Sequence, residues 1–346
     1  MSKSPALLRM FWRLATLLFT LSLTLFGLVA ITFVVGRCLP TDPVVAMVGD
    51  RASEELYQRT YLEMGLDKPI YRQFIIYARQ MLRGDFGTSM ITADPIASDI
   101  ARYFPATLEL STLAMIIGLF SGILLAVISV LYPDKFPDHL ARVAALASHS
   151  IPIYWLVLVA LLIFYVNLGW VSGPGRADVV YSFSVDRVTG LFMVDSLLAE
   201  NYDAFKNALS HAILPSILLG LVAMGFLARM IRGFLFHQIR QNYVKVLRLK
   251  GLSLRRVVLT HVLPNSLPEI MAVSAMTYAY LLEGAVLTET VFAWPGLGTY
   301  ITNSLFAADV KAVLSSTLVI GAVYVTLNML SEHMQKWFDP RNMKRT

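Results

Sequence analysis

The chain has 346 residues, of which 56% are hydrophobic and only 15% are charged, whereas soluble domains carry about a quarter charged residues. This composition excludes an ordinary water-soluble domain, and the single cysteine, Cys38, excludes an intramolecular disulfide framework and argues against a structural zinc site. The net charge of +6 does not by itself indicate nucleic-acid binding, because membrane proteins concentrate Lys and Arg on one side.

The first apolar run, residues 14–36, holds 23 consecutive uncharged residues. It follows a short basic segment, as the apolar region of a secretory signal would, but that region has only about 7–15 residues. No small-x-small cleavage site closes the run. We therefore interpret it as a retained first membrane span.

Several further runs are long enough to cross a hydrocarbon core of about 30 Å, which takes about 20 helical residues. They lie at 110–133, within 143–170, at 207–228 and at 312–331. Another run, from about 268 to 290, is interrupted near its far end by two glutamates. The sequence thus predicts an all-α membrane protein with six transmembrane helices, and this even number places both termini on one side.

The distribution of charge indicates which side that is. The N-terminal tail has three basic and no acidic residues, the segment 229–256 has eight and none, and the tail 336–345 has four and one. On the other face, residues 37–109 have eight basic and ten acidic residues, and 171–206 have three and five. Because basic residues favour the cytoplasmic side, we expect both termini in the cytoplasm.

Residues 37–109 are long enough to form an extracytoplasmic subdomain. Within them, "GLDKPIYRQFIIYARQMLRGDFGTS" predicts an amphipathic helix that begins near Pro69, carries apolar residues at spacings of three and four, and ends before Gly84. We favour a helix that caps the membrane domain over one that lies on the lipid surface.

The second span carries small residues at every fourth position. They are Ala114, Gly118, Gly122 and Ala126. Such a stripe lets a neighbouring helix approach closely, either within the chain or in a partner subunit.

Enzymatic motifs are absent from the sequence: it has no G-x-x-x-x-G-K-[S/T], H-E-x-x-H, C-x-x-C or G-x-S-x-G.

His149 and His211 fall inside predicted spans, and we favour hydrogen-bonded structural imidazoles over a functional role. Glu283 and Glu289 are the costliest side chains within the predicted spans. Glu289 opens "ETVFAWPGLGTY", in which Trp294, Pro295 and Gly296 must break the helix. This element is either an interfacial turn or an outer gate of a pathway.

The segment from Tyr243 to Asn265 carries five Lys or Arg and no acidic residue. It fits a topology signal, a lipid anchor or a docking surface for another protein. The stretch "HQIRQNYVKVLRLK" predicts a helix that ends at Gly251 in a left-handed cap, and Ser253 fits the N-cap of a second helix from Leu254 to about Leu263. Two short helices joined at a glycine favour docking.

At these residues the chain resembles the permeases of binding-protein-dependent ABC importers. Gly251, Leu263 and Pro264 occupy the Gly and Leu-Pro places of that family's cytoplasmic loop signature, whereas Lys245-Val246-Leu247 stands at its E-A-A and His261 at its Ile. With "GLDKPIYRQ", "LRGDFGTS", "RYFPATLEL", "LLEGAVLTETVFAWPGLG" and "WFDPR", the pattern resembles the dipeptide, oligopeptide and nickel branch, from about Thr41 to Arg341.

The resemblance implies a multi-pass permease of the bacterial inner membrane that imports small peptides or related solutes. It implies four segments: tail and first span 1–36, extracytoplasmic subdomain 37–109, a five-span core 110–333 with the coupling loop 233–265, and a cytoplasmic tail 334–346. Residues expected to couple to the ATPase are Tyr243, Arg248, Lys250, Gly251, Leu252, Ser253, Arg255, Arg256, Leu263 and Pro264. Residues expected at the translocation path or outer gate are Glu283, Glu289, Trp294, Pro295 and Gly296.

The resemblance also implies partners. They are a second, non-identical permease, two cytoplasmic ATPases that use ATP and Mg, and an extracytoplasmic solute-binding protein. The chain itself is expected to lie in the lipid bilayer. It is expected to bind no cofactor and no nucleic acid and to catalyse no reaction. The alternative is an ATP-independent secondary carrier or channel, which predicts paired charges deep within spans and internal symmetry. The sequence has neither feature.

Overall fold

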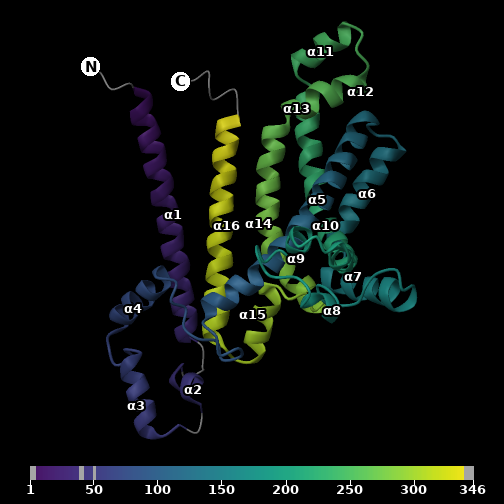
Figure 1. The fold of residues 1–346 in the computed structure, drawn as a ribbon. Helices are drawn as coiled ribbons and strands as arrows, with labels where there is room; N and C mark the ends of the chain where they lie inside the picture. The colour runs from purple at the N-terminus through teal and green to yellow at the C-terminus, as the bar shows by residue number, and fades with distance from the viewer. Residues whose placement is uncertain (1–4, 39–42, 50–51, 339–346) are drawn as a thin grey trace. The chain divides into compact units, whose positions relative to one another are not determined.

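The structure is a computed structural model that describes residues 5–38, 43–49 and 52–338, and the regular elements in these residues are helices (Figure 1). The helices are α1 (Pro5–Cys38), α2 (Pro43–Val48), α3 (Glu54–Glu63), α4 (Ile70–Leu82), α5 (Ile96–Leu131), α6 (Phe136–Ser150), α7 (Ile153–Ala160), α8 (Val179–Ser182), α9 (Phe192–Leu198), α10 (Tyr202–Ile239), α11 (Asn242–Leu249), α12 (Leu254–Val257), α13 (Leu263–Asn265), α14 (Leu267–Val291), α15 (Leu297–Phe306) and α16 (Val310–Phe338). Two π-helical stretches, Leu161–Asn167 and Val258–Val262, extend α7 and α12. The predicted all-α class is confirmed.

Five helices in the described part of the chain are long and apolar enough to cross a membrane. They are Leu18–Cys38 of α1, α5, α10, α14 and Val310–Ser331 of α16. A sixth crossing is formed if the bent pair Phe136–Ser148 and Ile153–Asn167 counts as one span. These helices correspond to the six predicted apolar runs.

The bent pair turns by 98° between its two helices. The bend falls at Ile151 and Pro152, where the backbone is extended and proline lacks the N–H that would continue the helix. The hydroxyls of Ser148 and Ser150 donate to carbonyl oxygens of the preceding turn, at 3.0 and 2.9 Å. The third span is therefore broken at this point; the side chain of His149 lies outside the described residues.

The chain divides into two compact units. One unit comprises Met1–Tyr103 with Tyr300–Thr326, and the other comprises Phe104–Thr299 with Leu327–Thr346. In the first unit, α4 packs on α1: the rings of Phe33 and Phe74 meet edge to face at 5.4 Å, and the Tyr77 hydroxyl donates to Thr32 at 3.1 Å. This contact agrees with the expectation that the amphipathic helix covers membrane-spanning structure.

In the second unit, α5 and α10 approach each other closely. A Cβ on Gly118 would lie 2.7 Å from the Ala223 Cβ, and one on Gly122 would lie 3.0 Å from the Leu227 Cβ. The small residues of α5 are therefore required by close packing within the chain. This settles the alternative that the sequence left open: the stripe packs against α10 of the same molecule.

Candidate coupling segment and outer turn

The basic segment between α10 and α14 folds into two short helices that project beyond the end of α10 (Figure 1). The sequence predicted one helix from His237 to Gly251, and this was wrong in one respect. The helix breaks at Arg240 and Gln241, where Gln241 is extended, with φ −70° and ψ 152°. The break lets α11 fold back so that Val244 is buried in the core of the second unit.

Gly251 ends α11 in the left-handed conformation that the sequence predicted, with φ +85°. Its N–H donates to the Arg248 carbonyl at 3.0 Å, and the Leu252 N–H donates to the Leu247 carbonyl at 3.3 Å. These two bonds form a Schellman motif, which satisfies helix carbonyls that would otherwise lack partners. Leu247 and Leu252, which hold the two positions of the motif's hydrophobic contact, both pack on the core.

The second short helix begins as predicted at Ser253, whose hydroxyl accepts from the Arg256 N–H at 3.4 Å. It continues beyond Leu263 to Asn265, with a π-helical stretch that ends at Val262, two residues before Pro264. A π turn accommodates a helix in which proline removes one donor. The chain then enters α14 through Ser266 without an extended linker, since the Ile270 N–H bonds to the Ser266 carbonyl at 3.0 Å.

The two helices divide their side chains between the core and solvent. Val257, Val258 and Val262 are fully buried, and Tyr243, Leu252 and Leu263 pack against the same cluster. The exposed basic residues of the segment are Lys245, Arg248, Lys250, Arg255 and Arg256. Arg248 is not free, because its guanidinium donates to the Leu252 carbonyl at 2.8 Å and fixes the turn.

The structure adds an apolar residue that sequence reasoning missed. Leu249, the last residue of α11, is 88% exposed and lies between Arg248 and Lys250. Val246 on the same helix is 50% exposed. The only sequence signal was their place opposite Val244 on an amphipathic helix. An exposed leucine with basic neighbours fits the contact surface of a partner protein better than a pure topology signal.

The second candidate element lies at the other end of α14. This helix has 25 residues and is about 38 Å long at 1.5 Å per residue, so its two ends reach opposite faces of a bilayer. Glu289, near the far end, is completely buried. Its carboxylate accepts from the N–H groups of Gly298 and Thr299 at 2.7 and 3.3 Å. A carboxylate at a helix N-terminus is favoured by the helix dipole, so Glu289 caps α15.

The Trp-Pro-Gly turn is shaped around that carboxylate. A Cβ on Gly296 would lie 2.3 Å from the Glu289 carboxyl carbon, so any larger residue would have to displace this buried carboxylate. Trp294 is completely buried, and its indole N–H donates to the Ala106 carbonyl at 2.9 Å. The predicted helix break is present, between Val291 and Leu297.

Glu283 is placed differently from Glu289. It is exposed on α14 in one stripe with Met276, Tyr280 and Leu287, which are 47%, 55% and 50% exposed. A carboxylate on a membrane-spanning helix is costly against lipid. The stripe therefore requires a protein partner or a water-filled pathway beside it.

The remaining polar candidate, His211, is a hydrogen-bonded structural residue. Its Nδ1 lies 2.9 Å from the Asn207 carbonyl oxygen, and its Nε2 lies 3.5 Å from Asp178 Oδ1. The interpretation of a satisfied imidazole is supported by these contacts. Among residues 5–38, 43–49 and 52–338, no group of three or more His, Cys, Asp or Glu side chains could hold a metal ion.

Comparison with known proteins gives consistent matches over most of the chain. Residues 115–344 match the family described as the binding-protein-dependent transport system inner membrane component, and residues 10–111 match its N-terminal family. The probable D,D-dipeptide transport system permease protein DdpB of Escherichia coli (strain K12) is 38% identical, over 93% of this chain and 94% of that protein. The di/tripeptide permease DppB of Pseudomonas aeruginosa (strain UCBPP-PA14) is 35% identical over 92% and 94%.

Two further matches extend the comparison. The dipeptide permease DppB of Escherichia coli (strain K12) is 33% identical, over 92% of this chain and 94% of that protein. Among solved structures, a chain of the MetNI methionine ABC transporter in an inward-facing conformation matches with a TM-score of 0.49 and 17% identity, over 67% of this chain and 93% of that chain.

The apolar helices define an integral membrane protein with several spans. The chain belongs to the family of inner-membrane components of binding-protein-dependent transport systems, and it is a permease of the peptide ABC importer type. The family resemblance read from its motifs is confirmed, as are the permease fold, the transport function and the inner-membrane location.

Proposed function

We propose that this permease imports dipeptides or similarly small peptides. The support is the set of relatives named as dipeptide or di/tripeptide permeases, each matched over more than nine-tenths of both chains. The alternative of an ATP-independent carrier or channel is not favoured, because the family works with a binding protein.

The same proposal assigns partners to the two ends of the molecule. A second, non-identical permease completes the pathway, two cytoplasmic ATPases hydrolyse ATP with Mg, and a solute-binding protein delivers the peptide to the outer face. The excess of Lys and Arg in 229–256 supports a cytoplasmic position for the coupling segment. Residues 37–109 then form the extracytoplasmic subdomain.

The coupling segment, residues 233–265, is proposed as the ATPase contact. The observation that carries this assignment is the exposed Leu249 among basic residues, on a helix pair whose opposite face is fixed in the core. Closure of the ATPases would move the segment as a rigid body together with α10 and α14, a common form of two-state switching. Transport, rather than catalysis, is the chain's own task.

At the far end of α14, we assign Glu283 to the translocation path. Its exposure on the helix supports this role. Glu289, Trp294, Pro295 and Gly296 form the rigid turn that supports the outer gate, because the carboxylate and the indole are both buried and hydrogen-bonded.

The coupling assignment is tested by Leu249→Ser in the full importer. We expect the variant to lose most of its co-purifying ATPase subunits while still reaching the membrane. The matched control is Leu82→Ser at the end of α4, where the leucine is 86% exposed. Equal ATPase recovery with both variants would contradict the assignment.

A further inference from the structure

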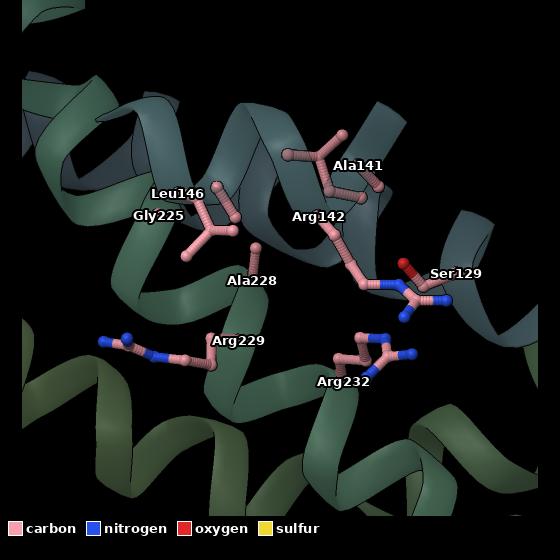
Figure 2. Close-up of a pocket in the computed structure, with 10 residues that line it drawn as sticks. Ser129, Ala141, Arg142, Leu146, Gly225, Ala228, Arg229 and Arg232 are labelled. Atoms are coloured by element: carbon pink, nitrogen blue, oxygen red, sulfur yellow. The ribbon is translucent and has the colours of Figure 1, made fainter. Parts of the chain in front are cut away.

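A pocket of about 220 Å³ lies between α5, α6 and α10, close to where α10 leads into the coupling segment (Figure 2). Its walls combine apolar side chains, among them Leu125, Leu146 and Ala228, with the three arginines Arg142, Arg229 and Arg232. Figure 2 shows the guanidinium groups of Arg142 and Arg232 on the side of Ser129, while Arg229 extends in the opposite direction.

The charges around this pocket do not balance. Asp138 is completely buried and is shared by Arg142 and by Arg232, whose Nη2 lies 3.4 Å from Asp138 Oδ1. Asp134 also pairs with Arg142, at 2.9 Å. Arg229 has no carboxylate within ion-pair distance among the described residues; it lies over the Phe226 ring at 5.9 Å. Two carboxylates therefore face three guanidinium groups, which leaves one positive charge.

Two hydrogen-bond donors of the cluster are also unused. The Nε atoms of Arg142 and Arg232 are buried and have no hydrogen-bond partner within the described residues. A buried donor without a partner costs free energy, and a guanidinium presents its N–H groups in a fork that matches the oxygens of a phosphate. The side chains of Arg142 and Arg232 are 37% and 32% exposed and line the pocket, so their other N–H groups can donate to the oxygens of an anion.

The pocket lies at the boundary of the membrane. Arg142 is the last charged residue before the charge-free stretch 143–175, and Arg229 is the first after 207–228. Asp134 is the first charged residue after 110–133. All three helices therefore change from apolar to charged at this level, which is where phospholipid headgroups meet a membrane protein.

We propose that this pocket binds an anionic phospholipid. The phosphate accepts from the guanidinium groups of Arg142 and Arg232, the excess charge of Arg229 selects a headgroup with net negative charge, and an acyl chain lies along Leu146. Leu146 is 62% exposed beside the pocket, and Val143 and Leu140 on the same face of α6 are 61% and 58% exposed. A basic pocket between spans with an apolar continuation fits a lipid better than a free phosphate.

The test measures lipid binding to the purified full-length chain in a neutral detergent. Native mass spectrometry counts bound dioleoylphosphatidylglycerol and bound dioleoylphosphatidylcholine over a titration. We expect the wild-type chain to favour the anionic lipid, and Arg229→Gln to reduce that preference about fivefold, since one basic residue near the surface contributes about 1 kcal/mol. Arg229→Lys keeps the charge and should keep the preference.

Arg240→Gln is the matched control, because Arg240 is exposed at the end of the same helix and lies outside the pocket lining. We expect it to leave the preference unchanged. Equal effects of Arg229→Gln and Arg240→Gln would overturn the proposal, as would equal binding of both lipids by the wild-type chain. Displacement of the lipid by millimolar inorganic phosphate would also overturn it, because the ligand would then be a free anion.

Discussion

Arg176 and Glu109 form a buried ion pair, Nε to Oε2 at 2.7 Å, although 67 positions separate them in the sequence. Their side chains are 16% and 6% exposed. The other carboxylate oxygen accepts from the Met193 N–H at 2.7 Å, and Arg176 also donates to the Gly190 carbonyl at 3.0 Å. The pair therefore ties the long connection between α7 and α10 to α5.

Removal of one partner should be costly. We expect Arg176→Met to lower the free energy of unfolding by about 3–5 kcal/mol, because it leaves a buried carboxylate without its counter-charge. Thermal unfolding of the purified chain measures this. Lys206→Met is the control, since Lys206 pairs with Asp203 at 3.9 Å on the surface, and such pairs contribute about 0–1 kcal/mol. Similar losses in both variants would contradict a special role for Glu109.

Asp195 should give the second unit an acid-sensitive component of stability. Burial by itself raises the pKa of this carboxyl, but hydrogen bonds from Thr189 and Gly190 outweigh it and hold the pKa below its usual range. A lowered pKa in the folded state means that the contribution is present above the unfolded pKa of about 3.9 and is lost as pH falls through the folded value.

The prediction concerns the stability difference between wild type and Asp195→Asn. We expect it to be largest above about pH 4 and to shrink as the pH falls, because protonation removes the advantage of the carboxylate. Unfolding measured across this pH range checks the expectation. A difference that is the same at every pH would show that the hydrogen bonds do not depend on the charge.

The two glutamates of α14 should behave in opposite ways. Glu289→Ala removes the carboxyl oxygen that accepts from the first N–H groups of α15, so we expect the free energy of unfolding to fall by about 1–3 kcal/mol. Glu283→Gln changes an exposed carboxylate, so stability should change by less than about 0.5 kcal/mol while peptide uptake changes. Uptake in vesicles and thermal unfolding separate the two effects. If Glu283→Gln left uptake unchanged, the path assignment would fail.

Gly251→Val should uncouple transport while the chain still inserts. The backbone at Gly251 has φ +85°, and this conformation costs a side chain about 1–2 kcal/mol, with more for a β-branched residue. The site has open space, so the cost comes from the backbone alone. Gly251→Asn should therefore retain more activity. The measurement is peptide-stimulated ATPase activity of the reconstituted complex, and normal activity of Gly251→Val would contradict the prediction.

Arg255 and Arg256 test whether the basic segment acts in docking or only in topology. Both are exposed and lie next to the Ser253 cap. We expect their joint change to Glu to weaken ATPase recovery several-fold with the spans unchanged in orientation. Reporter fusions and co-purification measure the two quantities. Inverted spans with intact ATPase attachment would favour the topology role instead.

The spans, the helix caps and the helix break could be predicted from the sequence, because each depends on local chemistry. Long charge-free runs predict spans because lipid excludes charge, and Gly251 and Ser253 predict caps because only certain residues satisfy helix ends. The break at Trp294-Pro295-Gly296 follows from proline and glycine in the same way. For these features, neighbours in the sequence carry the whole physical reason.

Contacts between residues far apart in the sequence could not be predicted in this way. Leu249 is exposed because α11 folds back with Val244, on its other side, against the core. Glu289 is buried against a helix that begins eight positions later, at Leu297. The excess of arginine over carboxylate around Asp138 arises only where α6 and α10 come together. The burial of a side chain and its ion-pair partners depend on residues that the fold brings next to it. Its neighbours in the sequence do not show which residues these are.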